Sequence, residues 1–175
     1  MPKLIAVVGG KHSGKTTIIE GLIAELKRRG YHVGAIKEMV RIPTLDTPQT
    51  ETDRYANAGA ETIVAFPRNE TVVFIKKRLN LNEVLPFLKG LDYVILEGFE
   101  TEKTVPKIIA AKTAEEAKGY FDDSAIAVSG MIMESKTETK KASDLKIPLF
   151  KSLMQAGELA DLVEKKAIEF KKIAT

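Results

Sequence analysis

Cysteine is absent from this chain of 175 residues. Disulfides, iron–sulfur clusters and thiolate zinc sites are therefore excluded within the chain. Long hydrophobic runs are absent too. The first apolar run, residues 4–8, is too short to span a membrane, and Lys11 and Lys15 follow it closely. A phosphate-binding pattern follows it rather than a small-residue cleavage site, so we expect a cytoplasmic protein without a membrane partner.

The chain has little excess of either charge sign, because its net charge is only +3. An excess this small does not indicate a nucleic-acid surface, so we expect no nucleic-acid partner. Internal repeats are not visible. Apolar residues make up 44% and charged residues 29% of the sequence, as in ordinary soluble globular proteins. The length suits one α/β domain with a single core, predicted over residues 1–175.

Residues 9–17 comprise the phosphate-binding pattern G-x-x-x-x-G-K-[ST], at 9–16, and the threonine that follows it. They are Gly9, Gly10, Lys11, His12, Ser13, Gly14, Lys15, Thr16 and Thr17. The glycines permit backbone angles that a Cβ forbids, so the loop can curl around a phosphate and point its N–H groups inward. The pattern predicts that Lys15 reaches the β- and γ-phosphates of a nucleotide, and that the Thr16 hydroxyl ligates Mg²⁺. His12 either lines the phosphates or is merely tolerated in the loop.

The flanking sequence supplies the context that this loop needs. Residues 4–8 form an unbroken apolar run, typical of a strand buried on both faces. After the loop, apolar residues recur at helical spacing, namely Ile18, Ile19, Leu22, Ile23 and Leu26. Basic residues at 27–29 and a glycine at position 30 then indicate the end of that helix.

Further strands are predicted from β-rich or apolar runs at residues 31–37, 62–66, 71–75, 93–96, 107–111, 125–128 and 147–150. The turn at residues 67–70 indicates a hairpin between the second and third of these. Helices are expected at residues 51–58 and 80–89, after Thr113, and near the C-terminus. In the C-terminal helix, one face would be apolar and consist of Leu159, Leu162, Val163, Ala167 and Phe170. The solvent-exposed face would carry Lys165, Lys166, Lys171 and Lys172. Residues 134–146 are expected to form a solvated loop or a fraying helix.

Strands that alternate with helices predict a three-layer α/β fold of the P-loop NTPase type. Its sheet would be mostly parallel, with an antiparallel hairpin addition. Ligands in such sheets bind beyond the carboxyl ends of the strands. The phosphate loop, the loop at 37–50, Glu97 and residues 129–130 should therefore lie along one edge.

Two carboxylates are candidates to hold Mg²⁺ together with Thr16. Glu97 ends an apolar strand, as the second acidic element of P-loop NTPases does, and Asp46 lies in the long loop after the second strand. One or two carboxylates suffice, because Mg²⁺ keeps several waters. We therefore predict Lys15, Glu97 and Asp46 as catalytic residues. Alternatively, Glu97 is a surface glutamate that starts a loop, and Asp46 is an aspartate of the kind that loops favour without any metal role.

The combination of motifs resembles the molybdopterin-guanine dinucleotide biosynthesis protein B (MobB) family. Besides the phosphate loop, the segment Asp46-Thr47-Pro48 followed by residues 51–54 resembles that family's D-x-P-G-K-D-[ST]-x-R element. Its A-G-A, E-G-F, P-K-I and I-P-x-F elements are similar to residues 58–60, 97–99, 106–108 and 147–150. The family's K-H-x-H-H after the second strand is replaced by Lys37-Glu38-Met39-Val40-Arg41, and the acid after its late strand by Gly130.

The resemblance implies a GTP-binding, weakly GTP-hydrolysing homodimer that requires Mg²⁺. Its partner would be a MobA-like guanylyltransferase that attaches GMP to the molybdenum or tungsten pterin cofactor, and molybdopterin itself is a further candidate ligand. Guanine preference rests on the resemblance alone, because the sequence contains no N-K-x-D. A small-molecule kinase on the same fold, or a non-catalytic adaptor gated by nucleotide, remain alternatives.

Overall fold

The computed structural model describes residues 1–151 and 153–170. The chain divides into two compact units. The first comprises residues 1–38 and the chain from Leu85 onward, and the second comprises residues 39–84. The single domain that the sequence predicts over 1–175 stays a prediction. No helix among the described residues is both long and apolar enough to cross a membrane.

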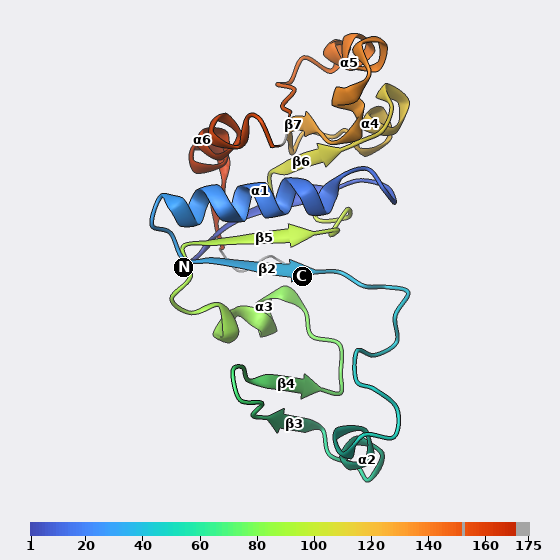
Figure 1. Cartoon of the computed structure of the whole chain (residues 1–175), viewed down its shortest axis with the longest axis vertical. Helices are drawn as coiled ribbons and strands as arrows, with labels where there is room; N and C mark the ends of the chain where they lie inside the picture. The colour runs from blue at the N-terminus through green and yellow to red at the C-terminus, as the bar shows by residue number, and fades with distance from the viewer. Residues whose placement is uncertain (152, 171–175) are drawn as a thin grey trace. The chain divides into compact units, whose positions relative to one another are not determined.

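The first unit is built on a mostly parallel sheet (Figure 1). Its strands are β1 (Lys3–Val8), β2 (Val33–Lys37), β5 (Tyr93–Glu97), β6 (Lys107–Ala110), β7 (Ala125–Ser129) and β8 (Ile168–Glu169). The order β2-β5-β1-β6-β7 is parallel throughout, and the short β8 pairs antiparallel with the start of β1. β1 is thus central, which explains why every residue from Leu4 to Val8 is buried.

Two helices cover one face of this sheet. α1 (Lys15–Arg28) and α6 (Ala156–Lys166) lie side by side, as Figure 1 shows in blue and red. Their apolar stripes meet inward-facing strand residues in one cluster. It comprises Ile5, Val7, Ile18, Ile19, Leu22, Leu26, Tyr93, Ile95, Ile108, Ala110, Ala127, Leu159, Ala160 and Val163. The apolar residues that recur at helical spacing after the phosphate loop therefore form the side of α1 that faces the core.

The remaining helices of the first unit are short. α4 (Ala114–Tyr120) and α5 (Lys136–Ala142) begin at the caps Thr113 and Ser135, whose side chains accept from backbone N–H groups three residues on. Single 3₁₀ turns lie at Leu85–Leu88, Met131–Glu134 and Ser143–Leu145. The predicted solvated stretch at 134–146 is thus largely helical, because the Ser135 cap orders its first turn.

The second unit contains α2 (Glu51–Asn57), β3 (Thr62–Ala65), β4 (Val72–Ile75) and α3 (Leu81–Val84). β3 and β4 form the predicted antiparallel hairpin, but as a separate two-stranded sheet. A capping box starts α3, since the backbone N–H of Asn80 donates to the Glu83 carboxylate and the backbone N–H of Glu83 donates to the Asn80 side chain. The expected helix at 80–89 divides into α3 and a 3₁₀ turn that contains Pro86.

Two predicted elements differ from the structure. Residues 147–150 form only an isolated parallel bridge from Leu149 to Val128. The C-terminal helix ends at Lys166, because the chain turns into β8, and Ala167 and Phe170 lie outside it. Phe170 is nevertheless fully buried. Lys171 and Lys172 lie outside the described residues.

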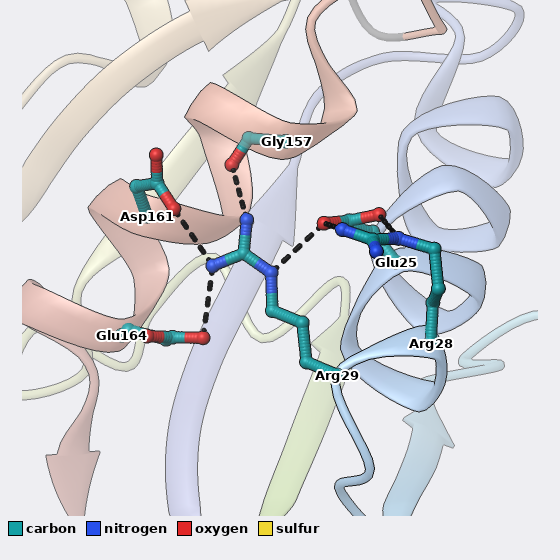
Figure 2. A network of polar contacts seen from close by, with 6 residues as sticks. All are labelled: Glu25, Arg28, Arg29, Gly157, Asp161 and Glu164. Carbon is teal, nitrogen blue, oxygen red and sulfur yellow. Dashed lines mark hydrogen bonds and ion pairs between the residues drawn. The ribbon is translucent and has the colours of Figure 1, made fainter.

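Arg29 connects the end of α1 to α6. Its guanidinium donates to Glu25, Asp161, Glu164 and the carbonyl of Gly157, at 2.7–2.9 Å, as Figure 2 shows. Hydrogen bonds from Arg28 and from Arg29 hold the pKa of Glu25 down at about 2, against a smaller opposing effect of burial. The guanidinium therefore joins two helices that are more than a hundred residues apart in sequence.

We expect Arg29→Ala to lower the melting temperature by about 2–8 °C, because several charge-assisted hydrogen bonds between α1 and α6 are lost. The matched control is Arg28→Ala. The Arg28 side chain is 72% exposed and pairs with Glu25 on its own helix, so its loss should have a small effect. Thermal unfolding followed by circular dichroism compares the two variants, and equal shifts would contradict a connecting role for Arg29.

Candidate functional site

The predicted phosphate loop joins the end of β1 to the start of α1. Gly9 and Gly14 have φ angles of +145° and +98°, so both glycines of the pattern occupy conformations that other residues rarely adopt. A Cβ on Gly9 would also lie 2.0 Å from the carbonyl oxygen of Ala110 at the end of β6. The His12 side chain is exposed, and its backbone has a left-handed φ of +60° that the curl of the loop imposes. The local pattern and its context are as predicted.

The ammonium of Lys15 folds back over this loop. Its Nζ donates to the carbonyl oxygens of Gly9 and Gly10, each at 2.6 Å. An ammonium has three donors, so one remains for a further acceptor. The first turn of α1 contains Lys15, Thr16 and Thr17 and no acidic residue. Positive charge and the first N–H groups of a helix therefore gather at one point, which favours an anion.

The loop is packed from the side of β7 and the turn that follows it. The backbone N–H of Met131 donates to the carbonyl of Ser13 at 3.1 Å. Gly130 has φ +95°, and a Cβ there would lie 2.2 Å from that same carbonyl oxygen. The Ser13 hydroxyl is buried and has no hydrogen-bond partner among the described residues. Glycine at position 130, where the resembling family often has an acid, is thus required by the close approach of the loop.

The loop is also contacted from α4, which sequence reasoning missed. A Cβ on Gly10 would lie 2.2 Å from Oε1 of Glu116. Oε2 of Glu116 accepts from the backbone N–H of Lys112 at 2.6 Å, and Nζ of Lys112 donates to the carbonyl of Lys11 at 3.2 Å. The sequence indicates only the cap at Thr113 and Glu116. That cap determines where α4 begins but not which face of α4 is turned to the phosphate loop.

Glu97 lies at the carboxyl end of β5, beside β1. In the strand register it is opposite Val7, two residues before the loop begins, and opposite Lys37 at the end of β2. Its carboxylate forms an ion pair with Nζ of Lys37 at 2.9 Å, and its side chain is 17% exposed. The predicted edge position of Glu97 is therefore confirmed, while its predicted metal and catalytic roles stay predictions.

Asp46 belongs to the second unit and is buried there. Its carboxylate accepts from Nζ of Lys76 at 2.6 Å and from the Thr52 hydroxyl at 2.8 Å. The hydrogen bond from Lys76 lowers the pKa of Asp46, outweighing the opposite effect of burial. The sequence predicts Asp46 as a metal ligand from the long loop after β2, and the structure pairs it with a residue 30 positions away. Its metal and catalytic roles stay predictions.

The chemistry of the donor set fits a phosphate group with a hard cation. Lys15 and the start of α1 suit phosphate oxygens, and the Thr16 hydroxyl and the Glu97 carboxylate are oxygen ligands of the kind that Mg²⁺ prefers. Among the described residues no group of three or more His, Cys, Asp or Glu side chains could hold a metal ion. A cation at this site would therefore depend on few protein ligands and on the phosphates themselves.

Comparisons with known proteins agree with this arrangement. The family model of molybdopterin guanine dinucleotide synthesis protein B, MobB, matches residues 4–132. A putative molybdopterin-guanine dinucleotide biosynthesis adapter protein of Methanocaldococcus jannaschii is 33% identical over 131 residues, which are 72% of this chain and 54% of that protein. The probable adapter protein of Bacillus subtilis is 30% identical over 142 residues, covering 77% of this chain and 80% of its own length.

The chain thus spans about half the length of the archaeal relative. Among solved structures, Bacillus subtilis MobB superimposes with a TM-score of 0.71 at 22% identity, over 97% of this chain and 99% of that one. A MobB homolog of Bacillus stearothermophilus gives 0.65 at 23% identity, over 93% and 98%. These structural likenesses confirm the predicted α/β fold with a mostly parallel sheet. Since the family model covers well over half of the sequence, this chain belongs to the MobB family.

Proposed function

We propose that the protein binds GTP with Mg²⁺ at the phosphate loop, hydrolyses it slowly, and acts as an adapter in molybdopterin guanine dinucleotide biosynthesis. The pathway comes from the names of the curated relatives. The nucleotide part rests on one observation, the Lys15 ammonium held over the loop carbonyls at the start of α1. The partner would be a MobA-like guanylyltransferase, with molybdopterin as a further candidate ligand.

The proposed hydrolysis asks little covalent chemistry of the chain. Lys15 and the loop N–H groups bind and orient the phosphates and offset their charge. Thr16, Glu97 and Asp46 would hold Mg²⁺, which when bound supplies further neutralisation of phosphate charge. A protein that positions phosphates without a dedicated general base is expected to turn over slowly, as an adapter would.

Titration of the protein with labelled GTP and ATP analogues, followed by turnover with and without a phosphate acceptor, tests this proposal. Slow hydrolysis of GTP without an acceptor is the expected result. Phosphoryl transfer that depends on an acceptor would favour a small-molecule kinase, and tight binding without turnover would favour a non-catalytic adaptor. Displacement of the GTP analogue by ATP as readily as by GTP would contradict the guanine preference.

Glu97→Gln is expected to weaken Mg²⁺-dependent nucleotide binding and turnover together, by at least about tenfold. Glu97 leaves a rigid central strand, so its carboxylate is in place in every state. Asp46→Asn should leave binding nearly intact and lower kcat, if Asp46 acts only in a closed state. A Mg²⁺ titration of GTP affinity, with steady-state hydrolysis, is the measurement. Wild-type Mg²⁺ dependence in Glu97→Gln would remove its metal role.

The Asp46 variant needs its own control, because the carboxylate also pairs with Lys76. Lys76→Met breaks that pair while leaving the carboxylate. If Lys76→Met lowers kcat as much as Asp46→Asn does, the effect belongs to the ion pair rather than to a metal. If Asp46→Asn weakens nucleotide binding as much as a Lys15 variant does, Asp46 does not act only in a closed state of its loop.

We predict a homodimer. The hairpin supports it, because both of its strands are sheet edges and expose apolar side chains, with Phe66 79%, Val64 47% and Val73 42% exposed. Light scattering at micromolar concentration should give about twice the 19.3 kDa of one chain. Phe66→Lys should shift that mass toward the monomer, and a wild-type mass of one chain would contradict the prediction.

A further inference from the structure

The turn after β5 has an unusual backbone. Gly98 has φ +91° and Phe99 has φ +55°, so two consecutive residues are left-handed. A phenylalanine rarely adopts this conformation, because its Cβ then crowds the following carbonyl oxygen. A conformation of that kind persists only where its surroundings fix it. The contacts of this turn therefore matter for the residue that precedes it, Glu97.

Several hydrogen bonds fix the turn, among them one from Glu102 to the carbonyl of Phe99 at 3.0 Å, and Glu38 makes two of them. The backbone N–H of Gly98 donates to the carbonyl of Val7 at 3.1 Å, which attaches the turn to β1. The backbone N–H of Phe99 donates to Oε2 of Glu38 at 3.1 Å. The backbone N–H of Glu38 in turn donates to the carbonyl of Glu97 at 2.9 Å. Glu38 directly follows β2, so it binds the turn on both sides of Gly98.

The side chain of Glu38 also fits closely against the turn. A Cβ on Gly98 would lie 3.2 Å from Cβ of Glu38 and 3.6 Å from its Oε2. The glycine therefore lets the carboxylate approach the Phe99 N–H. A carboxylate suits this task because it only accepts hydrogen bonds, and its charge strengthens the bond from a backbone N–H.

We propose, on the basis of the proposed nucleotide-binding function, that Glu38 is a positioning residue for Glu97. Its carboxylate holds residues 97–99 in the left-handed turn and so fixes the backbone from which the Glu97 carboxylate projects at the end of β5. Lys37, its neighbour in sequence, holds the same Glu97 carboxylate by an ion pair at 2.9 Å. Residues at the end of β2 thus hold both the backbone of Glu97 and its carboxylate, and the role assigned to Glu38 is to act through Glu97.

The test compares Glu38→Ala, which removes the acceptor, with Glu38→Gln, which keeps one acceptor oxygen and removes the charge. The first measurement is hydrogen exchange of the Phe99 amide in the nucleotide-free protein. We expect exchange to accelerate about tenfold or more in Glu38→Ala and to stay near wild type in Glu38→Gln. The matched control is Glu20→Ala, at an exposed position on α1.

The second measurement is the Mg²⁺ concentration that half-saturates binding of a GTP analogue. It should rise about tenfold or more in Glu38→Ala and change less than about twofold in Glu38→Gln, as expected of a residue that acts through another. Unchanged exchange and unchanged Mg²⁺ dependence in Glu38→Ala would overturn the proposal. So would a Glu38→Gln protein that keeps Phe99 protected but loses Mg²⁺ dependence, since Glu38 would then be a ligand.

Failure of the proposed function has a different signature. If the wild-type protein shows no Mg²⁺-dependent nucleotide binding, the nucleotide function is wrong and the link from Glu38 to a metal falls with it. The exchange measurement still decides whether Glu38 holds the turn, because it uses the protein without nucleotide. If the Phe99 amide of Glu38→Ala exchanges as slowly as that of the wild type, the proposal that Glu38 holds the turn is overturned in either case.

Discussion

Replacing Lys15 by alanine should weaken binding of a GTP analogue at least about 100-fold and leave the fold intact. Charge-assisted hydrogen bonds to phosphate are the strong ones, and this ammonium is the only side-chain cation that the phosphate-loop pattern assigns to the β- and γ-phosphates. The loss should be larger for GTP than for GDP, because the γ-phosphate contact disappears entirely. Alanine is the best helix former, so α1 should still begin at this position.

The measurement is a titration with a fluorescent nucleotide, paired with thermal unfolding to confirm the fold. Lys27→Ala is the matched control, since it removes the same charge from the last turn of the same helix. Its nucleotide affinity should stay within about twofold of wild type, because a surface charge this far along the helix is screened. Equal affinity of wild type and Lys15→Ala would remove the basis of the proposed function.

A second large effect is expected at Asp122, in stability rather than binding. Lys107 lies in β6 and its side chain is only 2% exposed, yet its ammonium donates to Oδ2 of Asp122 at 2.8 Å and to the carbonyl of Glu100 at 3.1 Å. Asp122→Asn leaves that buried ammonium without a counter-charge. Breaking a buried pair in this way costs about 3 kcal/mol, which corresponds to roughly 6–12 °C in melting temperature.

Lys107→Met should be milder than Asp122→Asn, because the Asp122 side chain is 31% exposed and keeps its hydrogen bonds from Ser124. Thermal and urea unfolding of both variants supply the comparison. A greater loss in Lys107→Met would contradict this account of the pair.

The same pair predicts acid sensitivity. Burial raises the pKa of Asp122, but the hydrogen bonds from Lys107 and Ser124 outweigh it and bring the pKa from 3.8 to about 2. The folded state therefore holds this proton less tightly than the unfolded state does. The resulting stability is complete above pH 3.8 and is lost as the pH falls toward about 2. The wild-type protein should lose stability over that window more steeply than Asp122→Asn does.

Sequence patterns succeeded where structure is local. The phosphate loop, the helix after it and the capping boxes depend on neighbouring residues, so their positions could be predicted. The strand that carries Glu97 was likewise recognised from its unbroken apolar run. The place of Glu97 at the same edge as the phosphate loop followed from the general rule that ligands lie at the carboxyl ends of parallel strands, whereas the pairing of β5 with β1 is known only from the structure.

Contacts between distant segments could not be predicted in this way. The pair of Asp46 and Lys76 joins a loop to the end of a hairpin, and neither residue carries a pattern that names the other. The approach of Glu116 to Gly10 depends on the rotation of α4, which a cap does not determine. The end of α6 at Lys166 depends on the pairing of β8 with β1, a tertiary contact that overrides the helical spacing of Ala167 and Phe170.

The close approach of Gly130 to the phosphate loop has a consequence for how this sequence can change over time. A Cβ on Gly14 would lie 3.2 Å from the Cα of Gly130, and a Cβ on Gly130 would lie 2.2 Å from the carbonyl oxygen of Ser13. Neither position can gain a side chain unless the opposite backbone moves. The two glycines are 116 residues apart, and a homologue with a side chain at position 130 should therefore have its phosphate loop or the turn after β7 displaced from the place it has here.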